Sequence, residues 1–159
     1  MTSTTASTTT ASTTTASTAT SGHPVVDRFL AAVRSGQIAH SEGLYTATTV
    51  VDAVVPGWRF PVRGDEAIRA EYGRWFNNPA TMDEVTRRPV GDDEVVEYTL
   101  TFTEDGVVHG LRHVHVFEID PALDRIVSDH VWCGGRWPAP LLAEMEAAAV
   151  APGTADVAG

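Results

Sequence analysis

The stretch "GLRHVHVFEIDPALDRIVSDHVWCGG", residues 110–135, predicts two long β-strands joined by a short turn. Side chains alternate between the two faces of a strand, so His113 and His115 point to the same side as Phe117. Asp129 falls on the matching face of the second strand, beside Val131, if the expected register holds. Apolar residues alone would suffice for a core, so two imidazoles and a carboxylate here indicate a functional site.

Before this hairpin the pattern predicts two further strands, Met82–Val90 and Glu94–Glu104, the second joined to the hairpin by a turn at Asp105-Gly106. An earlier strand, "TTVVDAVV", is closed by Pro56-Gly57. In the strand 94–104, Val95, Glu97, Thr99 and Thr101 alternate with Val96, Tyr98, Leu100 and Phe102. One face is therefore semi-polar and suits an interface, and we expect a homodimer.

Helical spacing precedes the strands. A first helix runs from Pro24 to a stop at Gly36, and a short one covers Ile38–Tyr45. A third begins at Asp65, which can cap it, and carries an apolar stripe of Ile68, Tyr72, Trp75 and Phe76. A last helix, within 138–150, has Leu141, Leu142, Met145 and Ala149 on one side. Helices followed by antiparallel strands predict an α+β fold, a curved sheet forming a cone around the N-terminal helices, with a mouth that can admit a small ligand.

Composition sets the broad class. The chain has 159 residues, 43% of them hydrophobic, and a formal net charge of -10. One domain fits this length, and the acidic balance argues against nucleic acid or an anionic membrane as a partner. The only cysteine is Cys133, so no intrachain disulfide can form.

The first 21 residues repeat "TTAST" and lack charge and aromatic side chains. We expect a disordered tail over 1–21, one domain over 22–151 and a flexible C-terminus over 152–159. The tail lacks the apolar region of a signal peptide, and no apolar run is long enough to cross a bilayer, so we expect a cytoplasmic protein.

The order of elements resembles the NTF2-like fold, and within it the SnoaL-like group. The resemblance is carried by "GLYTATTVVDAVVPGWRFPVRGDEAIRAEYGRWF", "GLRHVHVFEID" and "DRIVSDHVWCGG", and it extends over about residues 24–137. It implies the cone-shaped fold. It leaves function open, because this fold hosts isomerases, dehydratases, hydrolases, cyclases and non-catalytic binding modules.

The resemblance also suggests site residues. His115 falls where ketosteroid isomerase has its hydrogen-bonding acid, and His115 with Asp129 resembles the His and Asp that do acid/base work in SnoaL-type cyclases. Phe29 stands where the isomerase has a tyrosine on its first helix, and Phe29 cannot donate a hydrogen bond. Limonene-type epoxide hydrolases have an Arg and an Asp where His113 and His115 lie here. Neither of those exact mechanisms carries over.

We therefore predict catalytic roles for His115 and Asp129, assisted by His113. The residues predicted to line the substrate pocket are Asp52, Trp58, Tyr72, Trp75, Tyr98, Phe102, Phe117 and Val131. Other interpretations stay open. His115 can be a hydrogen-bonded interior histidine, and a register shift would turn Asp129 to solvent and bring His130 inward.

His-x-His with an Asp is a chemically valid metal ligand set, but the spacing is generic and no fourth ligand presents itself. We expect neither metal nor cofactor. Two functions remain. One is an acid/base cyclase, isomerase or dehydratase acting on a small, largely apolar carbonyl compound. The other is a non-catalytic ligand-binding or dimerisation module. A deep apolar cavity beside a bonded His115–Asp129 pair favours the enzyme, and a filled cone favours the module.

Overall fold

The computed structural model describes residues 22–150, so the predicted tails over 1–21 and 152–159 lie outside the described residues. The helices are α1 (Pro24–Ser35), a single 3-10 turn η1 (Ile38–His40), α2 (Asp65–Trp75) and α3 (Ala139–Val150). The strands are β1 (Tyr45–Val55), β2 (Trp58–Arg63), β3 (Thr81–Val90), β4 (Asp93–Glu104), β5 (Val107–Asp120), β6 (Arg125–Cys133) and β7 (Trp137–Pro138). The predicted α+β class is confirmed.

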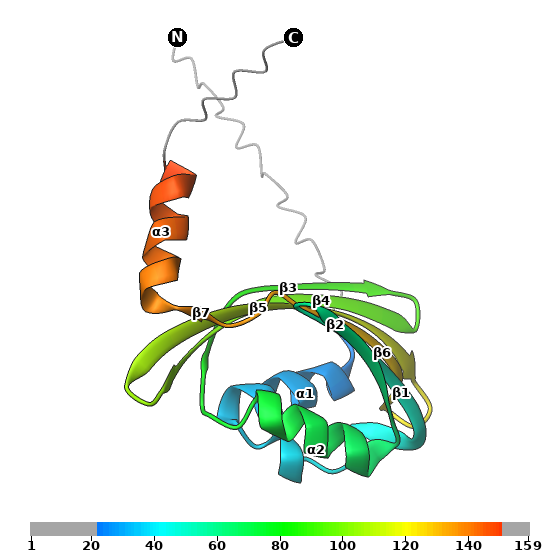
Figure 1. Cartoon of the computed structure of the whole chain (residues 1–159). Coiled ribbons are helices and arrows are strands. Elements are labelled where there is room, and N and C mark those ends of the chain that lie inside the picture. The colour runs from blue at the N-terminus through cyan, green and yellow to red at the C-terminus, as the bar shows by residue number, and fades with distance from the viewer. Residues whose placement is uncertain (1–21, 151–159) are drawn as a thin grey trace, which may run out of the picture.

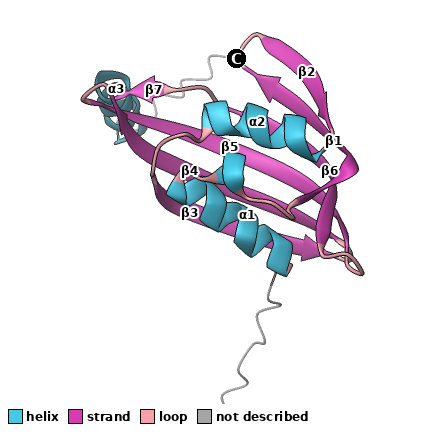
Figure 2. Ribbon diagram, turned by 90° about the horizontal axis from the view of Figure 1, so that it is seen from below, coloured by secondary structure: helices cyan, strands magenta, loops and turns pink. Residues whose placement is uncertain are grey.

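The strands form one curved sheet in the order β2-β1-β6-β5-β4-β3, with β7 paired to β5. The sheet arches over α1 and α2, which lie against its concave face (Figure 1). Figure 2, seen from below, shows the two helices side by side across the middle strands. The core therefore lies between one curved sheet and one layer of two helices.

Each core helix buries one face because its apolar residues recur at helical spacing. In α1 the buried residues include Val26, Phe29 and Val33, and in α2 they are Ile68 and Tyr72. Gly36 ends α1 in the left-handed conformation at φ 71°, and a Cβ there would lie 2.7 Å from the backbone of Asn78. This position therefore needs a glycine, which packs the end of α1 against the segment that follows α2.

Several predicted boundaries were wrong. The second helix predicted over Ile38–Tyr45 is only the turn η1, and Tyr45 already starts β1. β1 and β2 form a hairpin around the Pro56-Gly57 turn. α2 is preceded by Gly64, and Asp65 bonds Arg69 rather than capping the helix. β1 pairs with β6 in parallel, which the expectation of an antiparallel sheet did not include. Local patterns predict strands but not which distant strand they pair with.

The last helix forms as predicted, but it does not pack as a core helix. α3 projects away from the sheet (Figure 1), and its contacts include Leu142 against Gly110 of β5. Leu141 and Met145 are 40% and 42% exposed. Within residues 22–150 no helix is long and apolar enough to span a membrane.

The alternation predicted for β4 is confirmed. Val96, Tyr98, Leu100 and Phe102 are buried, while Val95, Glu97, Thr99 and Thr101 lie half-buried on the outer face. The homodimer expected from this face stays a prediction.

Candidate active site

The neighbouring strands β4, β5 and β6 bring Tyr98, His115 and Asp129 together on the concave face. In the β5–β6 register His115 lies opposite Val131, and Phe117 lies opposite Asp129. His115 and Asp129 are therefore diagonal neighbours, within reach of one another's side chains. The alternative register that would turn Asp129 to solvent is excluded, because Asp129 is buried and His130 is 45% exposed at its side chain.

A continuous chain of hydrogen bonds runs through this cluster. Tyr98 Oη of β4 lies 3.0 Å from His115 Nε2, and His115 Nδ1 lies 3.0 Å from Asp129 Oδ1. The Tyr72 hydroxyl of α2 donates to Asp129 Oδ2 at 2.5 Å. The predicted contact between His115 and Asp129 is confirmed, and it belongs to a longer chain, Tyr98–His115–Asp129–Tyr72.

The chemistry of the groups sets the direction of these bonds. A carboxylate accepts hydrogen bonds, so His115 Nδ1 carries the ring proton and Nε2 accepts from the Tyr98 hydroxyl. Burial, followed by the negative charge of Asp129, raises the pKa of Tyr72 and of Tyr98 well above their ordinary value. Both phenols therefore keep their protons and act as donors. Hydroxyl, imidazole and carboxylate stand in the order that acid/base and nucleophilic sites use.

The interior around this chain is packed. Tyr98, His115 and Asp129 are 0% exposed and Tyr72 is 1% exposed, so no bulk water reaches them. Phe29 packs edge-on against His115 at 5.0 Å between ring centroids, and Phe117 stacks on the His115 ring, also at 5.0 Å. The enzyme hypothesis required a bonded His115–Asp129 pair beside a deep apolar cavity. The bonded pair is present. The other requirement, a deep cavity beside the pair, is not met among residues 22–150, where aromatic rings pack against His115.

His113 lies in a different environment from His115. Its ring is 1% exposed, and neither Nδ1 nor Nε2 has a hydrogen-bond partner among residues 22–150. Its neighbours are the rings of Trp75, Phe76 and Tyr98, at 6.3, 5.1 and 5.5 Å between centroids. Burial, followed by the neighbouring His115, holds the pKa of His113 well below its ordinary value, so this imidazole is neutral at pH 7.

A small cavity of about 10 Å³ lies next to this aromatic group, between the end of α2 and the strands β4 and β5. Its lining includes Trp75, Phe76, Phe102 and Leu111. It has room for about one water molecule. Trp75 and Phe76 belong both to this lining and to the rings around His113, so the cavity adjoins the cluster.

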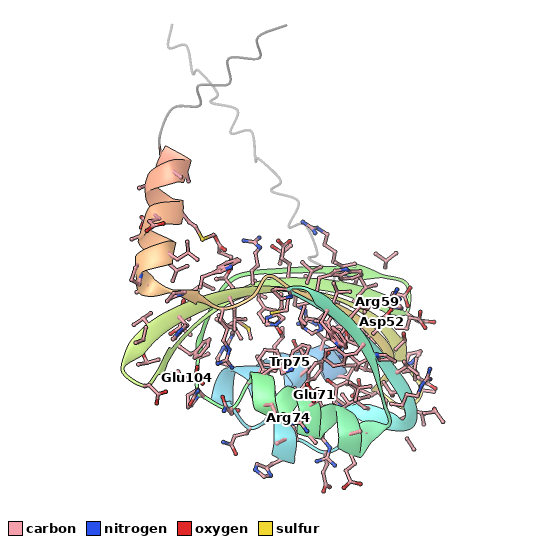
Figure 3. The ribbon with its side chains drawn as sticks, in the orientation of Figure 1. Asp52, Arg59, Glu71, Arg74, Trp75 and Glu104 are labelled. Carbon is pink, nitrogen blue, oxygen red and sulfur yellow. The ribbon has the colours of Figure 1, made fainter. Side chains whose placement is uncertain are left out.

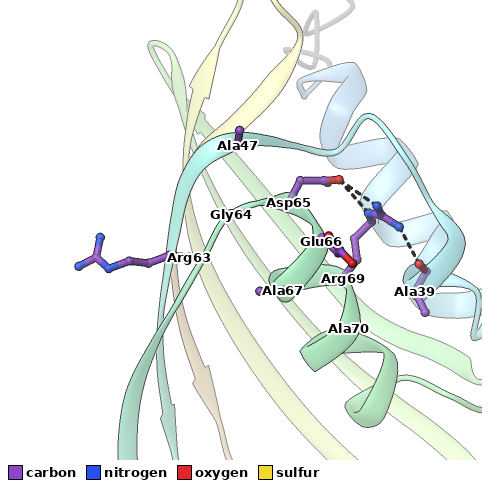
Figure 4. Close-up of a pocket in the computed structure, with 9 residues that line it drawn as sticks. All are labelled: Ala39, Ala47, Arg63, Gly64, Asp65, Glu66, Ala67, Arg69 and Ala70. Atoms are coloured by element: carbon purple, nitrogen blue, oxygen red, sulfur yellow. Dashed lines mark hydrogen bonds and ion pairs between the residues drawn. The ribbon is translucent and has the colours of Figure 1, made fainter.

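The larger hollow shown in Figure 4, of about 1010 Å³, lies elsewhere, at the start of α2. Two of its four charged residues, Asp65 and Arg69, bond each other, and Arg69 also donates to the Ala39 carbonyl at 2.8 Å. The predicted site residues are absent from its lining. It is a shallow groove that Arg63 and Glu66 also line.

Two predicted pocket residues are not part of the site. Asp52 lies on the outer face of β1, where Arg59 Nε donates to it at 3.0 Å, and Trp58 is 68% exposed at the start of β2. Figure 3 shows Asp52 and Arg59 together on the sheet, away from Trp75. Strand alternation explains the error for Asp52, because Val51 and Ala53 are the residues that point inward.

The sequence placed Tyr72 and Tyr98 among the lining residues but missed their hydrogen bonds. The Tyr72 ring of α2 lies 6.1 Å from that of Phe29 on α1, and its hydroxyl donates to Asp129. Helical spacing identified Tyr72 as inward-facing, but only the packing of α2 on the sheet aims its hydroxyl at Asp129. Within the described residues no three His, Cys, Asp or Glu side chains gather as a metal site.

Comparison with known proteins supports the fold. No protein-family model matches the sequence, and no curated protein does. Solved structures do match. A Bacillus subtilis protein thought to be an isomerase aligns with a TM-score of 0.57 and 15% identity over 69% of this chain and 84% of its own.

Two further structures align similarly. A Catenulispora acidiphila protein with a ketosteroid isomerase-like fold, solved with trimethylamine, gives a TM-score of 0.56 and 15% identity over 70% of this chain and 85% of its own. An NTF2-like protein of unknown function from Burkholderia xenovorans gives a TM-score of 0.54 and 16% identity over 76% of this chain and 88% of its own. The chain has the NTF2-like, ketosteroid isomerase-like fold. The narrower SnoaL-like resemblance stays a prediction.

Proposed function

We propose that this protein is a cofactor-free acid/base enzyme of the isomerase type, acting next to the carbonyl group of a small, largely apolar compound. The observation that carries the proposal is the buried chain Tyr98–His115–Asp129–Tyr72. Apolar side chains of similar volume would stabilise a core at least as well as a buried carboxylate with an imidazole and two phenols. Such an arrangement is typical of catalytic residues.

The order of the groups suggests the proton path. Tyr98 Oη accepts the proton from the carbon beside the carbonyl, while its own proton passes to His115 Nε2. The electrons of the broken C–H bond form the double bond of an enolate, whose oxygen takes the negative charge. Asp129 stabilises the imidazolium that results, because the two are in contact. Reversal of the path at a second carbon completes an isomerisation.

Tyr72 acts through Asp129 and is a positioning residue. Its hydroxyl fixes Oδ2, and the His115 ring is held by Phe29 and Phe117. A dehydration or a ring closure begins with the same proton removal. The cyclase and dehydratase alternatives therefore differ from the isomerase only in the steps after the enolate has formed.

One observation favours a second function. The space around His115 and Asp129 is filled by protein side chains. A non-catalytic module, in which the polar chain only specifies the packing of the core, accounts for this directly.

Proton exchange separates the two functions. The protein is incubated in D₂O with a β,γ-unsaturated cyclohexenone and with β-tetralone, and deuterium uptake and double-bond migration are followed by NMR. The protein is expected to make deuterium uptake and double-bond migration faster than in buffer. Asp129→Asn is expected to lower the rate of deuterium uptake by about a hundredfold or more. Asp52→Asn on the outer face is the matched control and keeps the parent rate. Exchange no faster than in buffer with both ketones would support the module.

A further inference from the structure

We propose that His113 is the group that contacts the ligand directly, and that this ligand is a small, uncharged, planar molecule with a carbonyl or hydroxyl group on one edge. The inference rests on the proposed function, since it names the substrate class of the same site. It starts from the difference between two histidines that share one face of β5.

His115 has no free nitrogen for a ligand. Nδ1 is bonded to Asp129 and Nε2 to Tyr98, so any contact with a substrate passes through the Tyr98 oxygen. His113, two residues earlier, has both nitrogens buried and unpartnered among residues 22–150. Leaving buried polar groups without partners is costly, and a bound ligand that bonds them removes that cost.

The surroundings of His113 define what fits there. Its ring contacts are aromatic, and the side chains lining the adjoining cavity, including Asn77 and Asn78, are uncharged. An ionic ligand would lose its hydration there without gaining a counter-ion. A neutral imidazole offers one N–H donor and one acceptor nitrogen, which suits a carbonyl or a hydroxyl.

The ring of Trp75 shows how a flat molecule can be held. It stacks on His113 with an angle of 18° between the planes, and its Nε1 donates to Glu71 Oε1 at 3.1 Å. Figure 3 shows Trp75 on the inner side of α2, between the helix and the sheet. A planar ligand that takes the place of the Trp75 ring would stack on His113 in the same way.

This placement also fits the proton path. Tyr98 is the side chain that both bonds His115 and contacts the His113 ring. A carbonyl oxygen that accepts from His113 N–H would lie near the Tyr98 oxygen, which removes the proton. His113 would then stabilise the charge that develops on the enolate oxygen.

The test measures binding of matched probes by titration calorimetry. β-Tetralone is neutral, planar in part and carries one carbonyl, and tetralin is the same ring system without the oxygen. β-Tetralone is expected to bind about tenfold more tightly than tetralin, the difference that about one good hydrogen bond makes. β-Naphthoate and a naphthylmethylammonium ion, with similar rings and opposite charges, are expected to bind more weakly than β-tetralone.

His113→Phe should abolish the preference of β-tetralone over tetralin while the protein stays folded, as near-ultraviolet circular dichroism will show. His130→Phe, a partly exposed histidine on β6, is the matched control and keeps the preference. An unchanged preference in His113→Phe, a charged probe binding best, or no binding of β-tetralone would each overturn the proposal. Binding of β-tetralone without proton exchange would support this ligand class and contradict the enzyme.

Discussion

The bond between Tyr72 and Asp129 makes a sharp prediction about stability. Tyr72→Phe removes one hydroxyl oxygen and leaves the ring in place among Phe29, Trp75 and Phe76. The lost contact is a buried hydrogen bond of 2.5 Å to a carboxylate. Bonds of this kind contribute about 1.5–3 kcal/mol to the free energy of unfolding. We expect a loss of that size.

Tyr45 provides the matched control inside the same core. It is 4% exposed, its ring lies 6.2 Å from that of Tyr72, and its hydroxyl has no hydrogen-bond partner among residues 22–150. Tyr45→Phe therefore removes a buried polar atom and breaks no bond. We expect its free energy of unfolding to stay the same or to rise by about 1 kcal/mol.

Urea unfolding followed by circular dichroism measures both variants. With a slope of about 2 kcal/mol per molar urea, Tyr72→Phe should lower the midpoint by about 1 M, and Tyr45→Phe should not lower it. Equal losses in the two variants would refute the reasoning, because the two substitutions differ only in whether the removed hydroxyl was bonded.

Two further predictions concern charge. The folded protein keeps His113 neutral, so only the unfolded chain binds a proton at this residue as the pH falls below about 6.5. The free energy of unfolding therefore falls on acidification, by at most about 1.4 kcal/mol per pH unit. His113→Phe should lose less between about pH 6.5 and 5.5 in urea titrations, and parallel curves for variant and parent would contradict this. Glu94 is 0% exposed and accepts from the His23 backbone N–H at 2.8 Å and from Arg87. Burial alone would raise the pKa of Glu94, but these bonds outweigh it and the pKa lies below its ordinary value. Glu94→Gln should cost about 1.5–3 kcal/mol by the same urea assay, whereas Glu97→Gln, which changes a solvent-screened pair with Arg112, should cost clearly less. A loss in Glu97→Gln as large as in Glu94→Gln would show that burial does not set the difference.

Local periodicity made the hairpin of β5 and β6 predictable. A period of two predicted His113 and His115 on one face of β5, and Asp129 and Val131 on one face of β6. The pairing of these strands also contains a register shift between Glu118 and Ile119, which the pattern did not predict. The same rule predicted the inward row of β4. The bonded His115–Asp129 pair could be predicted from the sequence because both residues lie on strands that are adjacent in the chain.

Contacts between distant segments could not be predicted in this way. The parallel pairing of β1 with β6 joins strands that are far apart in the chain, with Asp52 opposite His130, and nothing local in β1 specifies it. Asp52 was misplaced because a difference of one residue along β1 turns a side chain from the inner to the outer face. Trp58 was misplaced because an exposed aromatic after a turn has the same local pattern as one at a pocket mouth.

The α+β class, the inward faces of β4 and β5 and the His115–Asp129 pair could be predicted from the order and spacing of the residues alone. The packing of α2 on the sheet was needed to show that Tyr72 completes the hydrogen-bond chain and that aromatic rings close over it. The tertiary structure also leaves His113 without a partner among residues 22–150 while satisfying His115. The physical reason is that alternation and helical spacing are properties of short segments. Which hydroxyl meets which carboxylate depends on how a helix and a sheet pack, and that packing minimises the free energy of the whole domain.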